Sequence, residues 1–162
     1  MPLKAEGEFA LVVERIKAGL ERAGQPVKRA TMAHDHELYM TLTDTAAQTR
    51  DLIGLQEYTS KLEELARRDS HTLYLAIAER AHGVAYRLMG DYDSAYTHFQ
   101  RAFELFNELG TRWQLARTLS ELGELEMARG NLDTAREHYA RALEHFAALD
   151  ALPDVERTRA LM

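Results

Sequence analysis

Four consecutive polar residues, His34-Asp35-His36-Glu37, are the most chemically suggestive group in the chain. Imidazole and carboxylate side chains are the groups that bind Zn²⁺ and other divalent ions in proteins. Residues two positions apart on a helix point to different sides, so His34 and His36 would not aim at a common ion. This geometry favours the alternative, a solvated start of a helix, and we expect no metal site and no cofactor.

Four further histidines lie in the second half of the chain, and two of them occupy matching repeat positions. His98 and His138 lie 40 positions apart, and His145 follows His138 by two helical turns. Inheritance within a repeat explains the first two without a catalytic role, and we expect all three at the edge of the solvent. His82 stands where a core residue belongs, so we expect it to be a hydrogen-bonded residue at the core boundary.

Motifs for covalent or phosphate chemistry are missing from the sequence. None of the serines sits in a G-x-S-x-G turn, and there is neither a phosphate-binding loop nor a dinucleotide glycine fingerprint. Cysteine is absent, which excludes a thiol nucleophile and a Cys-based metal site. We therefore expect a protein that is not an enzyme.

Composition and charge further narrow the possible functions and the expected secondary structure. The chain has 162 residues and a formal net charge of −6, so its surface is poorly suited to non-specific binding of nucleic acid. No apolar run approaches the roughly 18–20 residues that a membrane span needs. The absence of cysteine fits a reducing cytoplasm, where we expect the protein to be. Ala, Leu, Glu and Arg dominate, and these residues favour helices.

A repeat with a period of 40 residues organises the second half of the chain. Each marker residue in the first copy has a counterpart in the second, and the pairs are Gly83/Gly123, Gly90/Gly130, Ala95/Ala135, Phe99/Tyr139, Ala102/Ala142 and Phe106/Phe146. A fixed period of this length indicates stacked supersecondary units. Glycines at 90 and 130 end one helix of each unit, which predicts helices over 72–89, 92–109, 112–129 and from 131 to about 149.

The spacing of small and aromatic residues in these units resembles the tetratricopeptide repeat. The residues that match are Gly83, Tyr86, Ala95, Phe99 and Ala102 in the first copy, and Leu122, Gly123, Ala135, Tyr139 and Ala142 in the second. Two positions depart from the pattern, because His82 replaces an apolar residue and Glu126 replaces an aromatic one. The 40-residue spacing is similar to the long-helix variety found in kinesin light chains and in large bacterial regulators of the maltose-activator type.

This resemblance implies a fold and a domain organisation. We expect an all-α, right-handed solenoid of antiparallel helix pairs, with about eight helices in one domain over 1–162. Its parts would be a solitary helix or cap over 5–24, a degenerate repeat over 27–69, repeats over 72–110 and 112–149, and a C-terminal helix over 154–161. An unrelated capping helix remains an alternative for the N-terminal segment, and apolar terminal helices suggest a homodimer or a piece of a longer protein.

The resemblance also implies a binding mode. In this family the first helix of each pair lines a concave groove, and the residues expected to meet a partner are Ile77, Arg80, Val84, Arg87, Trp113, Arg117, Ser120, Glu124 and Met127. The arginines could form a basic strip for acidic ligands, or each could pair with a glutamate one turn away, for which Glu79, Glu121 and Glu124 are close by. We expect a scaffold or adaptor that binds a protein or peptide, without contacting nucleic acid or membrane. The alternative is a sensor segment of a larger bacterial regulator.

Overall fold

The computed structural model describes residues 11, 14–15, 18 and 32–162. The expected N-terminal helix over 5–24 and the start of the degenerate repeat lie largely outside these residues. The described helices are α2 (Met32–Thr49), α3 (Leu52–Arg68), α4 (Thr72–Met89), α5 (Tyr92–Glu108), α6 (Arg112–Arg129), α7 (Leu132–Ala148) and α8 (Leu152–Ala160). No strand occurs within this part of the chain. The prediction of an all-α solenoid of helix pairs is confirmed.

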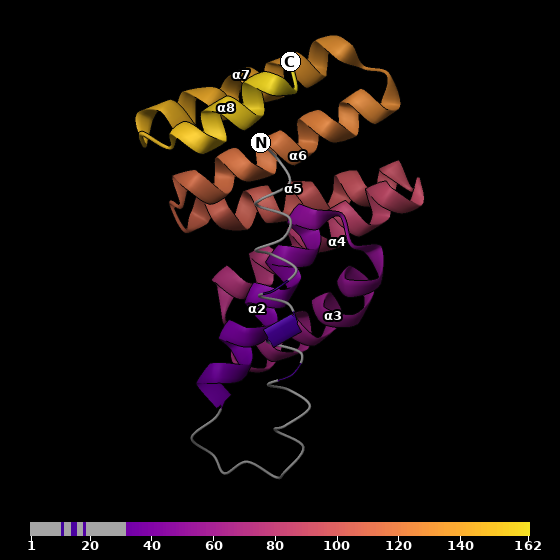
Figure 1. The fold of residues 1–162 in the computed structure, drawn as a ribbon, viewed down its shortest axis with the longest axis vertical. Coiled ribbons are helices and arrows are strands. Elements are labelled where there is room, and N and C mark those ends of the chain that lie inside the picture. The colour runs from indigo at the N-terminus through magenta and orange to yellow at the C-terminus, as the bar shows by residue number, and fades with distance from the viewer. Residues whose placement is uncertain (1–10, 12–13, 16–17, 19–31) are drawn as a thin grey trace.

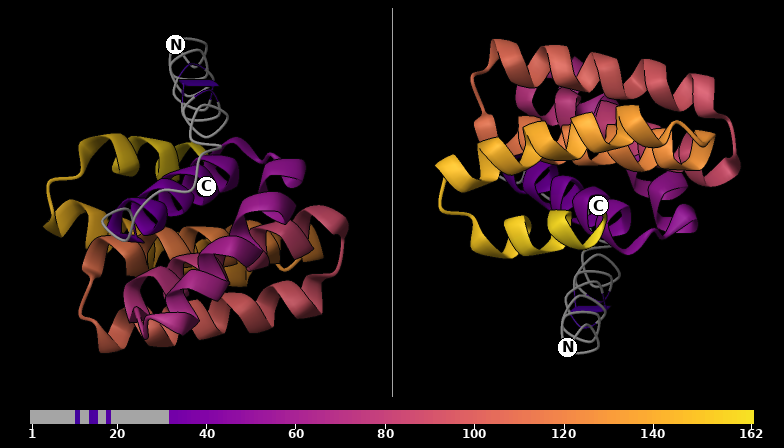
Figure 2. Two further views of the ribbon diagram at one scale, coloured as in Figure 1. Left: turned by 90° about the horizontal axis from the view of Figure 1, so that it is seen from below. Right: turned by 90° about the horizontal axis from the view of Figure 1, so that it is seen from above.

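The helices form antiparallel pairs that stack along the long axis of the molecule (Figure 1). Helices α2 and α3, α4 and α5, and α6 and α7 make the three pairs, and α8 packs on α7 at the C-terminal end. The views from below and above show the helices of neighbouring pairs lying across one another in layers (Figure 2). Each hairpin has one apolar stripe on each helix, and stacking buries these stripes against the next hairpin.

Glycine ends the first helix of two pairs because the chain must turn through the left-handed region. Gly90 and Gly130 have φ values of 82° and 83°, and no atom lies within 4 Å of a Cβ added to either. The first pair places Arg50 at the same repeat position, with a φ of 57°. An L-residue with a side chain rarely adopts this conformation, so Arg50 carries local strain that must be offset by its contacts.

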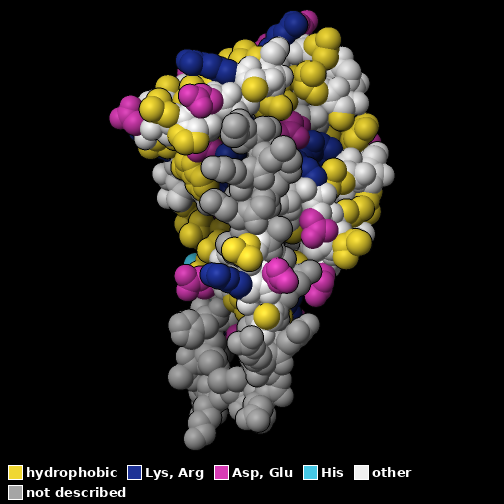
Figure 3. Space-filling view, viewed as in Figure 1, with side chains coloured by type: hydrophobic (Ala, Val, Ile, Leu, Met, Phe, Trp, Pro, Cys, Tyr) yellow, Lys and Arg dark blue, Asp and Glu magenta, His cyan; other side chains and the backbone are white. Residues whose placement is uncertain are grey.

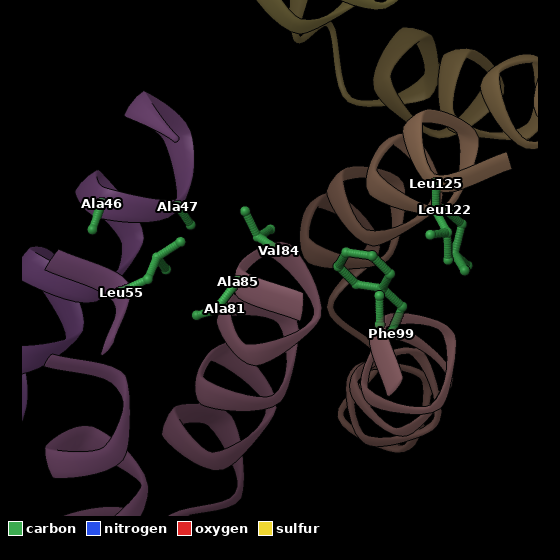
Figure 4. Packing of buried hydrophobic residues seen from close by; sticks show 10 residues of the cluster. Ala46, Ala47, Leu55, Ala81, Val84, Ala85, Phe99, Leu122 and Leu125 are labelled. Carbon is green, nitrogen blue, oxygen red and sulfur yellow. The ribbon is translucent and has the colours of Figure 1, made fainter. Parts of the chain in front are cut away.

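Close contact between a glycine and an aromatic ring locks the helices within each of the later pairs. A Cβ added to Gly83 would lie 2.5 Å from Cδ1 of Phe99, and one added to Gly123 would lie 2.5 Å from Cε1 of Tyr139. Phe99 is fully buried and points between α4 and α6 toward Leu122 (Figure 4). The residues that carry the resemblance to the tetratricopeptide repeat are all buried except Tyr86, which is half-buried.

The first pair fills the same space with a different distribution of side-chain volume. Thr43 and Thr59 occupy the positions of Gly83 and Phe99, while Leu55 takes the position of an alanine. All three residues of the first pair are buried. The hydroxyls of Thr43 and Thr59 find no hydrogen-bond partner. This pair therefore keeps the helical hairpin but loses the small-against-aromatic pattern.

Candidate partner-binding surface

Helices α2, α4 and α6 approach one another on one side of the stack, which we call the inner face. On this face Asp44 of α2 accepts hydrogen bonds from Arg80 of α4 at 3.2 Å and from Arg117 of α6 at 3.0 Å. Arg80 also donates to Oε1 of Gln114 at 2.6 Å. Side chains of α2 therefore reach α6 across one intervening pair, which requires the stack to curve toward this side.

A second cluster lies toward the C-terminal ends of the same helices. Arg87 of α4 contacts Glu121 at 2.9 Å and Glu124 at 2.6 Å. Arg50, at the end of α2, contacts the same two carboxylates at 2.9 Å and 2.6 Å. Each of the two guanidinium groups thus pairs with both carboxylates, and these four side chains join three helices.

Together these clusters form what we call the inner ionic network, which consists of Asp44, Arg50, Arg80, Arg87, Arg117, Glu121 and Glu124. Four guanidinium groups face three carboxylates, so the network carries a formal surplus of one positive charge. The Nε atom of Arg87 is buried without a hydrogen-bond partner. Each of these enclosed ionic groups has lost part of its hydration. They therefore stabilise the fold only because they pair with one another.

Burial and pairing act in opposite directions on the ionisation of the network. Burial raises the pKa of Asp44 and of Glu121, but the neighbouring arginines outweigh it and hold both pKa values below the usual range. Burial and the nearby charge of Arg117 lower the pKa of Arg80 to about 9, against the effect of Asp44. All of these groups therefore remain charged at pH 7.

The structure distributes the sequence-predicted groove residues between the core and the surface. Ile77, Arg80 and Val84 are buried, so they do not line an open surface. Ser120 is half-buried, and its hydroxyl donates to the carbonyl of Ala116. The arginines are held by carboxylates from other helices, which is neither a free basic strip nor pairing with a glutamate one turn away on the same helix. Figure 3 shows one face of the molecule, where acidic, basic and apolar side chains are intermixed.

Two of the predicted groove residues are exposed apolar side chains near opposite ends of α6. Trp113 is 40% exposed and Met127 is 44% exposed. The guanidinium carbon of Arg117 lies 4.8 Å from the centre of the Trp113 ring, a cation–π arrangement. Nε1 of Trp113 donates to Asp154 of α8 at 3.0 Å. The indole is therefore fixed in orientation while part of it faces solvent.

Arg50 is a member of the network that our reasoning from the sequence missed. Its signal was present, because the residue stands 40 positions before Gly90 and 80 before Gly130, where the repeat uses glycine. The partners, Glu121 and Glu124, lie more than 70 residues away and could not be found from local spacing.

Three histidines lie beside carboxylates from another helix or helix end. His82 lies 2.8 Å from Glu63, and His98 lies 2.8 Å from Glu79. His36 lies 2.8 Å from Asp69. Within residues 11, 14–15, 18 and 32–162, no group of three or more histidine and acidic side chains converges as metal ligands would.

His138 and Glu126 show how the second copy departs from the first. Leu119 stands at the repeat position of Glu79, so His138 lacks the carboxylate that pairs with His98. The Nδ1 atom of His138 is buried without a hydrogen-bond partner. Burial, and then the charge of Arg141, lowers the pKa of His138. Glu126 replaces the expected aromatic residue, is buried, and contacts Arg129 at 3.0 Å.

None of the described helices combines the length and the apolar character that crossing a membrane requires.

Comparison with known proteins adds two findings. The chain matches 14 chains of solved structures, among them the crystal structure of BtubC (BKLC) from P. vanneervenii. That match has a TM-score of 0.63 and 16% identity, and covers 98% of this chain and 72% of that one. At this identity the likeness shows a shared fold. A comparison with curated proteins finds no match.

The second finding is a match to a family model. The tetratricopeptide repeat model matches residues 74–148, which are the span of α4 to α7 where glycine and aromatic rings interlock. The first pair, with Thr43 and Thr59 at those positions, lies outside the match. Proteins with this repeat generally mediate protein–protein interaction. Residues 74–148 of this chain therefore match the tetratricopeptide repeat, which confirms the resemblance predicted from the sequence.

Proposed function

We propose that this chain is a scaffold or adaptor that holds a peptide or protein segment against its inner face, with Trp113 as the main anchor. The exposure of Trp113 carries the proposal. Tryptophan is enriched among residues that dominate binding energy at interfaces, and an anchor that is already oriented loses less entropy on binding. The contacts with Arg117 and Asp154 supply that orientation.

The surroundings of Trp113 support the same role. Arg117 is shared between the indole ring and Asp44, so the aromatic anchor is connected to the inner ionic network. Met127 lies 14 residues further along α6, roughly 21 Å away at 1.5 Å per residue. A partner segment that follows α6 would thus meet an apolar contact near each end and charged groups between them.

A peptide library displayed on phage provides ligands for the inner face even where the natural partner is unidentified. Selected peptides would be labelled and their Kd values measured by fluorescence polarisation. We expect Trp113→Ala to weaken binding by about 30-fold or more, the effect of losing a 2 kcal/mol anchor. Ile53→Ala is the matched control, since Ile53 is an exposed apolar residue on α3, and it should leave Kd within about twofold.

The selection also defines the result that opposes the proposal. Peptides that bind equally well to the wild type and to the Trp113→Ala variant would show that the anchor lies elsewhere. The chain contains a single tryptophan, so intrinsic fluorescence gives an independent readout of whether ligand reaches the indole. A cytoplasmic location, self-association and the role of a sensor segment in a larger regulator remain predictions from the sequence.

A further inference from the structure

Arg50 ties together helices that belong to repeats two units apart. It follows α2 directly and reaches Glu121 and Glu124 of α6, which are 71 and 74 residues further along the chain. Asp44 makes the same connection from within α2, at 2.9 Å from Arg117. In stacked repeat proteins each unit normally contacts only its neighbours. Here the inner face adds direct links between the first pair and the third.

The side-chain contacts of Arg50 make this link specific. Arg50 adopts a φ of 57° at the position that the later pairs give to glycine. A second group holds the side chain in place, because Arg50 also donates to the carbonyl of Ala47 at 2.8 Å. Ser70 and Asp150 adopt φ values of 52° at other helix ends, so what distinguishes Arg50 is its pairing with the two carboxylates of α6.

Closure of the inner face follows from these links. The carboxylates of Glu121 and Glu124 occupy the forks of both Arg50 and Arg87. Ile77 and Val84 are buried on the middle helix of the three. With α2 held to α6, the terminal guanidinium nitrogens of Arg50 and Arg87 are already paired with carboxylates of the chain itself.

We propose that Arg50, Glu121 and Glu124 form a latch that holds the inner face closed by joining α2 to α6 across α4. Release of the latch moves the C-terminal end of α2 away from α6 and frees the guanidinium fork of Arg50. The inference rests on the proposed function and deepens it by naming how access to the inner face is regulated. Its test uses the protein without any ligand, so it can fail while peptide binding at Trp113 stands.

A distance measurement across the latch is practical because the chain has no cysteine. Thr49 and Ala128 are exposed and lie near the C-terminal ends of α2 and α6. Both would be changed to cysteine and labelled with nitroxides, and the distance between the labels measured by electron paramagnetic resonance. Arg50→Gly removes the side chain and suits the left-handed backbone, so the hairpin turn is retained.

The expected result is a longer distance in the Arg50→Gly protein, by about the 3 Å width of one water molecule or more. Asp150→Gly is the matched control, because Asp150 also has a positive φ, of 52°, but lies outside the network. It should leave the distance unchanged. If the Arg50→Gly protein proves unfolded, Arg50→Lys takes its place. Lysine keeps the charge without the guanidinium fork, so the distance should be longer than in the wild type. An unchanged distance in a folded Arg50→Gly protein, or in Arg50→Lys in that second case, would overturn the latch.

Discussion

Gly83→Ala tests the interlocking of helices within a pair. The added Cβ would lie 2.5 Å, 2.6 Å and 3.0 Å from three atoms of the Phe99 ring. The ring is fully buried, so it cannot swing into solvent to make room. Overpacking of this kind costs about 1–3 kcal/mol, and three close atoms place this site near the upper value. Replacing glycine by alanine in a helix stabilises the helix by about 1 kcal/mol, which offsets part of this cost.

The net expectation is a loss of about 2 kcal/mol of unfolding free energy. For a chain of this size that corresponds to a fall in Tm of about 4–8 °C, measured by thermal unfolding followed by circular dichroism. Phe99→Leu should relieve the clash, so the double variant should be more stable than the sum of the single effects by about 1 kcal/mol.

Gly90→Ala separates the clash from the backbone effect. No atom lies within 4 Å of its added Cβ, while φ is 82°, so its cost comes from the left-handed conformation alone. Phe99→Leu should not rescue it, and the two effects should add within about 0.5 kcal/mol. A Gly83→Ala protein as stable as the wild type, or strict additivity with Phe99→Leu, would refute the proposed interlocking.

Three further predictions concern other parts of the structure. Because the pKa of His138 is lowered on folding, the unfolded chain binds more protons as pH falls below the ordinary value near 6.5, and stability falls. His138→Leu should therefore raise Tm more at about pH 5.5 than at about pH 8, and an equal change at both values would contradict this reasoning. Glu121→Gln leaves enclosed arginines partly unpaired and should cost about 3 kcal/mol in urea unfolding, whereas Glu64→Gln, at an exposed pair, should have little effect. Comparable losses would show that the inner network is no stronger than a surface pair. Thr59→Val removes a buried unpartnered hydroxyl and should add about 1 kcal/mol, and a loss of stability in the same assay would reveal a hydrogen bond for that hydroxyl.

The sequence predicts the helical architecture well because the relevant signals are local and repeated. Glycine at 90 and 130 marks the helix ends, and the alternation of alanine and aromatic residues marks the buried stripe. The first pair is harder to recognise, since Thr43 and Thr59 replace the marker residues.

The inner face was only partly predictable, because its contacts depend on how strongly the stack curves. Spacing on α4 places Arg80 and Arg87 on one side of the helix, as the structure has them. Their partners come from α2 and α6, and Arg50 reaches α6 only because of that curvature. Local sequence cannot report this long-range geometry, so it left a basic strip and paired arginines as alternatives, and the structure has a paired network.

The most direct test of the account is nuclear magnetic resonance mapping of a library-selected peptide on the isotopically labelled protein. Backbone amide shifts should change mainly on α2, α4 and α6, and the single indole N–H signal of Trp113 should move with the same titration curve. Shifts confined to α5 and α7, with the indole signal unmoved at saturation, would contradict binding at the inner face.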